Sequence, residues 1–288
     1  MKVAIMTDTN SGITAKEGEE LGIFVLPMPI IINQKNYLEG INITSRELFS
    51  AMRQGYNVST SQPSPMALTE MWDLIFSKGY DEIVYIPMSS GLSNSCHTAI
   101  QFAQEYNGRV QVADNHRISL TQKLSVLDAK RMADKNMTAV EICKKLENNG
   151  LNAMIYIAVD TLEYLKKSGR VTKAGAAIAT VMNIKPILSI QGDKLDAFAK
   201  VRGIQQCQKK MIEALKQDYL TRFSKFSKEK IVIGTAGSFE DAQQEQVWRN
   251  QVQEAFPEFD VPYTPLSCNI SSHTGWNARG LAIIVIDS

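Results

Sequence analysis

Apolar positions along the chain gather in short runs and in spaced stripes, and the two patterns alternate. Short runs, typical of buried strands, cover residues 2–7, 24–33, 83–86 and 109–113. Stripes with helical spacing begin at Pro65, and further helices are predicted at about 118–134 and 138–149. Thr44 and Glu47 have the spacing of a capping box, which marks the start of another helix. Alternating strands and helices predict parallel βαβ units, so we expect an α/β first half.

The second half also alternates, but a different kind of sheet is expected there. Strands are predicted at 152–159, 186–190, 194–201, 230–236 and 281–287. Helices are predicted after Thr161, near 173–183, from about Gly203 and from Ser238. The strands around 191–193 are expected to form a hairpin, which makes this half mixed α+β rather than purely parallel. The length of 288 residues favours two domains, which we place at 1–155 and 156–288 with no flexible linker between them.

Composition restricts the class of protein. The chain is 44% hydrophobic and 21% charged, as in globular proteins with a large core, and its net charge of +1 argues against binding nucleic acid through bulk charge. Its four cysteines are far apart and form no CxxC pair, so we expect buried free thiols and neither a metal nor another cofactor. The longest apolar run, near 24–32, is interrupted by Pro27 and Pro29 and is too short to span a bilayer. Because the N-terminus also lacks a signal-peptide pattern, we expect a cytoplasmic monomer without membrane insertion.

Two hydroxyl-rich stretches of the first half stand before predicted helices. "STSQPSP", residues 59–65, contains Thr60 and Ser61, and "SSGLSNS", residues 89–95, contains Ser93. Each stretch alone suits an ordinary helix N-cap. In a parallel sheet, however, both would lie at the carboxyl ends of the strands, where free N–H groups and helix dipoles favour a negative oxygen. Together they predict a binding place for an anion.

Two stretches of the second half add a histidine and a concentration of positive charge. "ISSHTGWNARG", residues 270–280, places His273 in a polar segment just before the last predicted strand. Between 166 and 202, only Asp193 and Asp196 oppose eight basic residues, which are Lys166, Lys167, Arg170, Lys173, Lys185, Lys194, Lys200 and Arg202. A solvated helix face and a docking face for an acidic or phosphorylated partner explain this concentration equally well.

Several segments, in this order and spacing, resemble the DegV family. They are "TDTNSGI", "LEGINITSRELF", "TSQPSP", "SSGLSNS", "KKSGRVTKAGA", "NIKPILSI" and "SSHTGWNARG". The resemblance covers essentially the whole chain, and "TSQPS" with "SSGLS" is specific as a pair. It implies a bacterial fatty-acid-binding protein of two α/β domains, with the acyl chain in a tunnel within the first domain and the carboxylate held where the domains meet.

The resemblance also implies roles for particular residues at the carboxylate. Thr60 and Ser93 would hydrogen-bond the carboxylate, and Ser61 belongs to the same motif as Thr60. His273, followed by Thr274 in "HTG", would support the carboxylate from the second domain. Neutral hydroxyls suit this task, because a carboxylate needs two or three donors. We therefore expect a long-chain fatty acid as the ligand.

Two arginines have a further implied role. In some DegV-like proteins a separate fatty acid kinase converts the bound acid into an acyl phosphate for phospholipid synthesis. Arg170 of "SGR" and Arg202 of "AKVRG" match basic positions near the head group or on the kinase-docking surface. The chain departs from the family pattern at Asn94–Ser95, where Gly-Thr is usual, and at Trp276–Ala278, where Pro-Gly-Ala is usual.

Two enzyme classes are the alternatives to a carrier. Ser93 follows Gly91, and His273 comes much later, which is the chain order of a serine hydrolase acting on a lipid or another ester. "GLSNS" lacks the second glycine of G-x-S-x-G, however, and no acid is marked as the third member of a triad. The second alternative is an enzyme with a phosphate ligand, related to dihydroxyacetone kinases. The sequence contains neither a Walker-type motif nor a clustered acidic metal site, which argues against nucleotide use by this chain. We predict a carrier that is not an enzyme.

Overall fold

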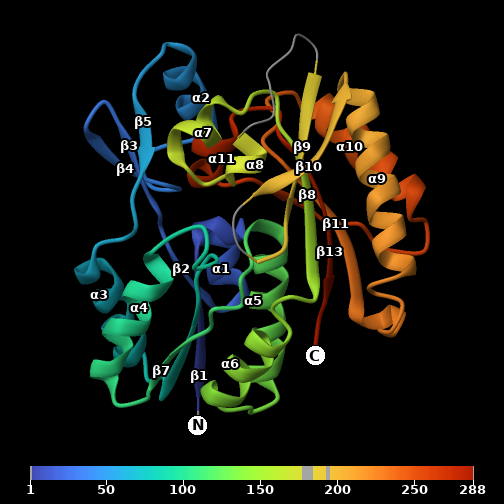
Figure 1. The fold of residues 1–288 in the computed structure, drawn as a ribbon. Helices are drawn as coiled ribbons and strands as arrows, with labels where there is room; N and C mark the ends of the chain where they lie inside the picture. The colour runs from blue at the N-terminus through green and yellow to red at the C-terminus, as the bar shows by residue number, and fades with distance from the viewer. Residues whose placement is uncertain (1, 177–183, 193–194, 288) are drawn as a thin grey trace.

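The computed structural model describes residues 2–176, 184–192 and 195–287, and within them the chain forms three sheets (Figure 1). The first sheet is parallel throughout, as predicted. Its strands, in spatial order, are β2 (Ile23–Leu26), β1 (Val3–Asp8), β6 (Glu82–Ile86) and β7 (Val110–Val112). The helices of this half are α1 (Ala15–Leu21), α2 (Ser45–Arg53), α3 (Pro65–Ser77), α4 (Ser95–Ala103), α5 (Ser119–Asp134) and α6 (Ala139–Asn148), with short 3-10 turns η1 (Thr9–Ser11) and η2 (Gln104–Tyr106).

Both faces of the parallel sheet are buried, because side chains alternate along its strands. On β1, Ala4 and Met6 pack on one side with Trp72 of α3 and with α4. Ile5 points to the other side, where it packs with Val126 of α5 and with α6. Such two-sided covering explains the continuous apolar runs in the sequence.

The second sheet is mixed, as predicted for the second half of the chain. Its strands, in spatial order, are β10 (Asp196–Arg202), β9 (Ile184–Ile190), β8 (Ala153–Ala158), β13 (Arg279–Val285), β11 (Ile231–Gly237) and β12 (Tyr263–Pro265). β9 and β10 form the expected antiparallel hairpin, whereas β11 and β12 run parallel. The helices of this half are α7 (Glu163–Ser168), α8 (Lys173–Ala176), α9 (Ile204–Leu220), α10 (Ala242–Ala255) and α11 (Cys268–Thr274), with the 3-10 turn η3 (Lys228–Lys230).

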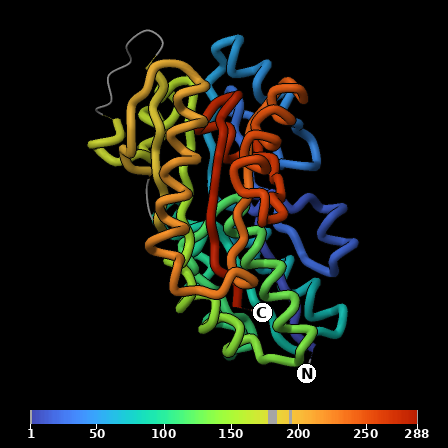
Figure 2. The backbone as a smooth tube through the Cα atoms, turned by 90° about the vertical axis from the view of Figure 1, so that its right-hand side faces the viewer, coloured from blue at the N-terminus to red at the C-terminus, as the bar shows by residue number. Residues whose placement is uncertain are grey.

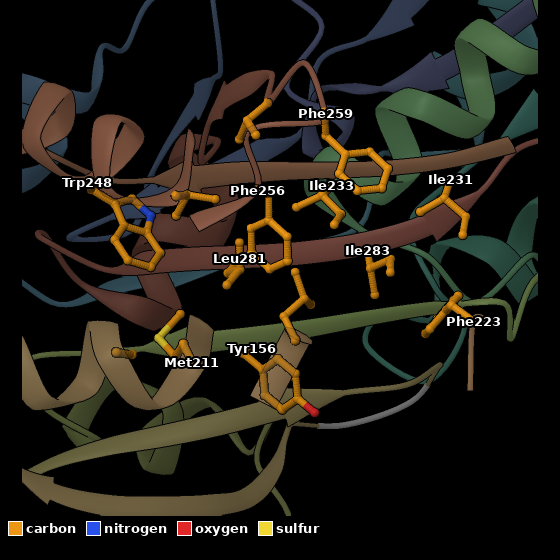
Figure 3. Packing of buried hydrophobic residues seen from close by; sticks show 14 of the residues in the cluster. Tyr156, Met211, Phe223, Ile231, Ile233, Trp248, Phe256, Phe259, Leu281 and Ile283 are labelled. Atoms are coloured by element: carbon orange, nitrogen blue, oxygen red, sulfur yellow. The ribbon is translucent and has the colours of Figure 1, made fainter. Parts of the chain in front are cut away.

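The two faces of the mixed sheet have different neighbours. Helices α9 and α10 cover the outer face, where Trp248, Phe256 and Met211 pack on Leu281 and Ile283 (Figure 3). The inner face packs against the first half of the chain and shares a core with segments that follow β2 and β6. Figure 2 shows β13, in red, running down between α9 and α10 toward the green helices of the first half. The two halves of the molecule therefore meet on the inner face of the mixed sheet.

A small antiparallel sheet of the first half was not predicted. It contains β4 (Lys35–Leu38), β3 (Pro29–Ile32) and β5 (Val58–Thr60). The run 24–33 was predicted as one extended segment, but the chain leaves the parallel sheet after β2 and re-enters a sheet at β3. Pro27 lies at this break, and a proline has no N–H to continue a ladder of hydrogen bonds.

Other predicted elements differ from the structure at their ends. The helix expected from Ser238 is α10, which begins four residues later and is capped by Asp241. The last strand spans 279–285 rather than 281–287. Of the helix expected near 173–183, α8 is described, and residues 177–183 lie outside the described residues. The capping box of Thr44 and Glu47 is confirmed at the start of α2.

Two further predictions concern the cysteines and the longest apolar run. All four cysteines are buried free thiols, as expected. Among the helices that the structure describes, none is long and apolar enough to cross a membrane.

Candidate functional site

A cavity of about 280 Å³ lies between the two halves of the molecule. Its volume is roughly twenty times the 10–15 Å³ that one water molecule needs. Apolar side chains form most of its wall: Met28, Met88, Leu92, Ile118, Leu120, Ile155, Ile157, Leu165, Ile190, Leu195, Ala236, Leu266, Ile270, Leu281 and Ala282. Such a wall suits a ligand that is mainly hydrocarbon.

Most of the apolar wall comes from β8, β9, β11, β13 and the helices of the second half. On the inner face of the mixed sheet, Leu165 of α7 and Ile270 of α11 share a core with Met28, Met88 and Leu92 of the first half. The tunnel within the first domain that the family resemblance implied stays a prediction.

The cavity has a polar part, and six residues singled out from the sequence line it. They are Thr60, Ser61, Ser93, Arg170, His273 and Thr274. They come from four segments of the chain: the end of β5, the loop before α4, the loop between α7 and α8, and α11. α11 packs beside α7 and near β5, so the fold brings together residues that are more than 200 positions apart (Figure 1).

Thr60 and His273 are in direct contact across the two halves. The Thr60 Oγ1 atom lies 2.9 Å from Nε2 of His273, within hydrogen-bonding distance. The other ring nitrogen of His273, Nδ1, is buried and has no hydrogen-bond partner among the described residues. A neutral imidazole protonated on Nε2 would donate to Thr60 and leave the threonine hydroxyl proton free for another acceptor.

Charge in the polar part resides on Arg170 rather than on His273. Burial, together with the positive charge of Arg170, lowers the pKa of His273 from 6.5 to about 4. Arg170 itself donates to the carbonyl of Ser168, and no carboxylate of the described residues lies within ion-pair distance of it. At neutral pH the polar part therefore combines one cation with neutral hydroxyl groups.

Ser93 stands where the parallel sheet leads into α4. Its Oγ accepts a hydrogen bond from the backbone N–H of Ser95, the first residue of α4, at 3.2 Å, whereas the N-cap residue Asn94 makes no side-chain cap bond. The hydroxyl proton of Ser93 is not used in that bond and can be donated elsewhere. The contact with Ser95 and a binding role are thus compatible at Ser93.

Helix α11 is held in place by residues of the first half. The buried carboxylate of Glu39 accepts hydrogen bonds from the backbone N–H groups of Cys268 and Asn269 and from the Thr9 hydroxyl. Burial raises the pKa of Glu39. Ser267 caps the same helix and donates to Asn10 Oδ1 at 3.0 Å. These contacts fix the element that carries His273.

Arg202 is not part of the cavity wall. It lies exposed at the end of β10, whereas the backbone of Arg170 contacts Leu195 just before that strand. Arg170 contacts the residue just before β10, and Arg202 is the last residue of β10. The seven residues of this strand, at roughly 3.3 Å each, separate these two positions by about 20 Å along the strand. The two basic residues thus mark different ends of the hairpin.

The other basic residues of this segment are not all free. Lys185 forms an ion pair with Asp160 at 2.7 Å, and Lys167 donates to Asn57 Oδ1 at 2.8 Å. Lys166, Lys173 and Lys200 are exposed. Lys194 and Asp193 lie outside the described residues.

Trp276, where the chain departs from the family pattern, packs among aromatic and basic side chains of two helices. Its indole makes edge contacts with Phe49 of α2 and Tyr164 of α7, at centroid distances of 6.4 and 6.0 Å. The guanidinium of Arg53 lies 4.8 Å from the indole centroid. Trp276 therefore packs α11 against α2 and α7 directly after the histidine.

Several polar residues of the cavity wall were not predicted from the sequence. They are Gln62, Asn269 and Ser119, and Asn94 was noted only as a departure from the family pattern. For Asn269 a signal existed, because it precedes His273 by four residues and so shares its helix face. The polar segment 270–280 has no apolar stripe, so α11 was not predicted.

The arrangement does not match a hydrolase triad. In a triad the histidine bonds the serine with one nitrogen and a carboxylate with the other. Here Nε2 of His273 contacts Thr60 instead of Ser93, and no carboxylate in the described part of the chain bonds Nδ1. Within the same part of the chain, no three or more side chains of the His, Cys, Asp and Glu types gather as a metal site.

Comparison with known proteins gives consistent results. Residues 2–285 match the family described as "Uncharacterised protein, DegV family". A DegV domain-containing protein of Deinococcus radiodurans is 30% identical over 285 residues, covering 98% of each chain. A DegV family protein from Thermus thermophilus, described as binding fatty acid, has a TM-score of 0.88 at 25% identity and covers 99% of this chain and 100% of its own. A fatty-acid-binding DegV family protein from Streptococcus agalactiae has a TM-score of 0.83 at 25% identity, with both chains covered completely.

Proposed function

The chain belongs to the DegV family, and we propose that it binds a long-chain fatty acid in the cavity between its halves. The observation that carries the proposal is the composition of the wall: a long apolar surface with hydroxyl groups and one unpaired arginine at one place. Two structural relatives are described as fatty-acid-binding proteins, which supports the same ligand class.

In this proposal the carboxylate lies between Thr60, Ser93 and Arg170. Ser93 accepts a hydrogen bond from the Ser95 backbone, and Thr60 accepts one from His273 when the ring is protonated on Nε2, so each hydroxyl then keeps its own proton for the ligand. Arg170 supplies the positive charge that makes these bonds charge-assisted. His273 acts as a positioning residue, because it orients the Thr60 hydroxyl.

The acyl chain would lie along the inner face of the mixed sheet, against Met28, Met88 and Leu92 on the opposite side. Each buried CH₂ group contributes up to about 0.8 kcal/mol until the cavity is full. Affinity should therefore rise with chain length and then level off. Methionine side chains adapt readily to ligands of different shape.

The family resemblance supports a second step, in which a separate fatty acid kinase phosphorylates the bound carboxylate. The chain itself would act as a carrier that presents the head group. Arg170 near the head group and the exposed Arg202 are the positions proposed to meet the kinase.

Denaturing mass spectrometry of the purified protein tests the ligand class. A stoichiometric long-chain fatty acid is the expected result. Ligand-free protein that hydrolyses esters would instead support the hydrolase alternative through Ser93 and His273.

Binding measurements on variants test the head-group assignment. Ser93→Ala and Thr60→Val should each weaken fatty-acid binding by about 1–3 kcal/mol, the usual cost of leaving a buried polar group unpaired. Ser59→Ala is the matched control, because Ser59 is exposed on the same strand and does not line the cavity. Unchanged affinity in both cavity variants would remove Thr60 and Ser93 from the site.

A further inference from the structure

The cavity wall includes a second polar feature, at the start of α5. Ile118, Ser119 and Leu120 line the cavity, and α5 is a helix of 16 residues. Leu120 packs closely on the mixed sheet, since a Cβ atom on Gly234 would lie 2.5 Å from its Cδ2. The start of α5 thus closes the cavity against β11 and β13.

This feature contacts the mixed sheet at a different place from α11, the helix that carries His273. Gly234 on β11 pairs with Ala282, whereas Gly237, three residues further along, pairs with Arg279. Next to Gly237, Ser238 donates to the carbonyl of Gly275, directly after α11. Three strand residues correspond to about 10 Å, so Leu120 and the end of α11 contact β11 about 10 Å apart along the strand.

The hydroxyl of Ser119 is buried without a partner. The residue is only 7% exposed, and its Oγ has no hydrogen bond within the described residues. The neighbouring Thr121 differs, because its hydroxyl donates to the Ile118 carbonyl at 2.9 Å. An unpaired hydroxyl in a largely apolar wall is unusual, since buried polar groups nearly always find a partner.

Within the described residues, backbone N–H groups at the start of α5 also lack carbonyl partners. Ser119 has a φ of +55°, a left-handed conformation that is unfavourable for residues other than glycine. In the described residues the first N–H of α5 to reach a carbonyl is that of Gln122, which donates to Ile118. The N–H groups before it, at the positive end of the helix dipole, favour an oxygen acceptor.

We propose that Ser119 and the first N–H groups of α5 recognise an oxygen atom carried by the acyl chain away from its carboxylate. A hydroxyl substituent fits best, because it can accept from the helix N–H groups and exchange a hydrogen bond with Ser119. The preferred ligand class is then a hydroxy fatty acid. This inference rests on the proposed function, since it places the carboxylate at Thr60 and Ser93.

The test compares fatty acids of equal length with and without a hydroxyl group. Delipidated full-length protein is titrated with stearic acid and with hydroxystearic acids substituted near the carboxyl end, at mid-chain or at the terminal carbon. Wild type should bind one of the two distal isomers about tenfold more tightly than stearic acid, the effect of one satisfied buried hydrogen bond. Ser119→Ala should abolish this preference without weakening stearic acid binding.

Ser119→Gly provides a second variant without the hydroxyl, and glycine tolerates the left-handed backbone. The inference is overturned if wild type prefers no distal hydroxy acid, or if the preference persists in both variants. Equal loss of affinity for stearic and hydroxystearic acid would make Ser119 a head-group residue and also overturn it. Failure of wild type to bind any fatty acid is a distinct result that would reject the proposed function itself.

Discussion

At the scale of single residues, the polar part of the cavity depends on a histidine that stays neutral. Its pKa of about 4 means that His273 carries no charge at physiological pH. A neutral ring can donate one hydrogen bond to Thr60 without placing a second buried cation beside Arg170. The guanidinium of Arg170 is thus the positive charge that the proposed ligand carboxylate would meet in the polar part.

This neutral histidine leads to a prediction about stability and pH. Because the pKa of His273 is lower in the folded protein than its ordinary 6.5, the unfolded chain takes up the proton first as pH falls. The contribution of His273 to the free energy of unfolding should be lost between about pH 6.5 and pH 4, by roughly 3 kcal/mol. Denaturant unfolding of His273→Gln across this range should show a smaller loss than wild type.

A buried aspartate serves as the internal control for that measurement. Burial raises the pKa of Asp8 from 3.8 to about 6, so its contribution has the opposite sign and declines as pH rises through the same range. Asp8→Asn should therefore change the pH profile in the opposite direction to His273→Gln. Parallel profiles for wild type and His273→Gln would contradict a buried neutral histidine.

Some residues of the site could be predicted from sequence and others could not. Thr60, Ser93 and His273 stand in recognisable polar motifs next to predicted elements. Ser119 has no such signal, because its importance comes from burial among distant segments. Glu39 stands in the segment "LEGINITSRELF", but nothing in that segment indicates its hydrogen bonds to α11. A lone serine in "RISLTQ" looks like any helix start until the cavity beside it is known.

At the scale of elements, α11 shows why a short polar helix escapes prediction. It has seven residues with Asn, Ser, Ser, His and Thr among them, and so lacks the apolar stripe that identified α3, α5 and α6. Residues that precede or contact α11 stabilise it: Ser267 caps the helix, and Glu39 accepts hydrogen bonds from its first N–H groups. Helices with strong periodicity were predicted within a few residues because their own sequence contains the signal.

Replacement of Glu39 tests this support for α11. Glu39→Gln replaces one acceptor oxygen with an N–H₂ group that faces backbone donors, so we expect a loss of about 1–3 kcal/mol in the free energy of unfolding. Fatty-acid affinity should fall as well, because α11 carries His273. The measurements are urea unfolding and ligand titration.

Glu47→Gln is the control for Glu39→Gln. Glu47 belongs to the exposed capping box of α2, where glutamine serves as well as glutamate. It should change stability little and leave fatty-acid affinity unaltered. If Glu39→Gln behaves the same way, α11 does not depend on the buried carboxylate.

At the scale of the whole molecule, the cavity exists because two differently built sheets meet. The inner face of the mixed sheet packs against the first half. Asn10 and Glu39 accept hydrogen bonds from the second half, and Arg117 donates one to it. The parallel and mixed sheets were predictable from alternation along the chain. The position of the cavity was not, because local patterns do not say how the inner face of the mixed sheet packs against loops and helices from distant parts of the chain.

The basic hairpin gives the last prediction, which concerns the proposed kinase. Arg202 is exposed and lies outside the cavity, so Arg202→Ala should retain bound fatty acid. If the hairpin docks a fatty acid kinase, the fatty acid bound to this variant should be phosphorylated several-fold more slowly, because charges at the rim of an interface set the rate of encounter. The wild-type reaction should also slow as salt rises, since exposed charges are screened.

Lys144→Ala removes an exposed charge from α6 in the first half and is the matched control. Equal turnover of wild type, Arg202→Ala and Lys144→Ala at low and high salt would show that the basic residues form a solvated face, whereas loss in Arg202→Ala alone would place the kinase on the hairpin.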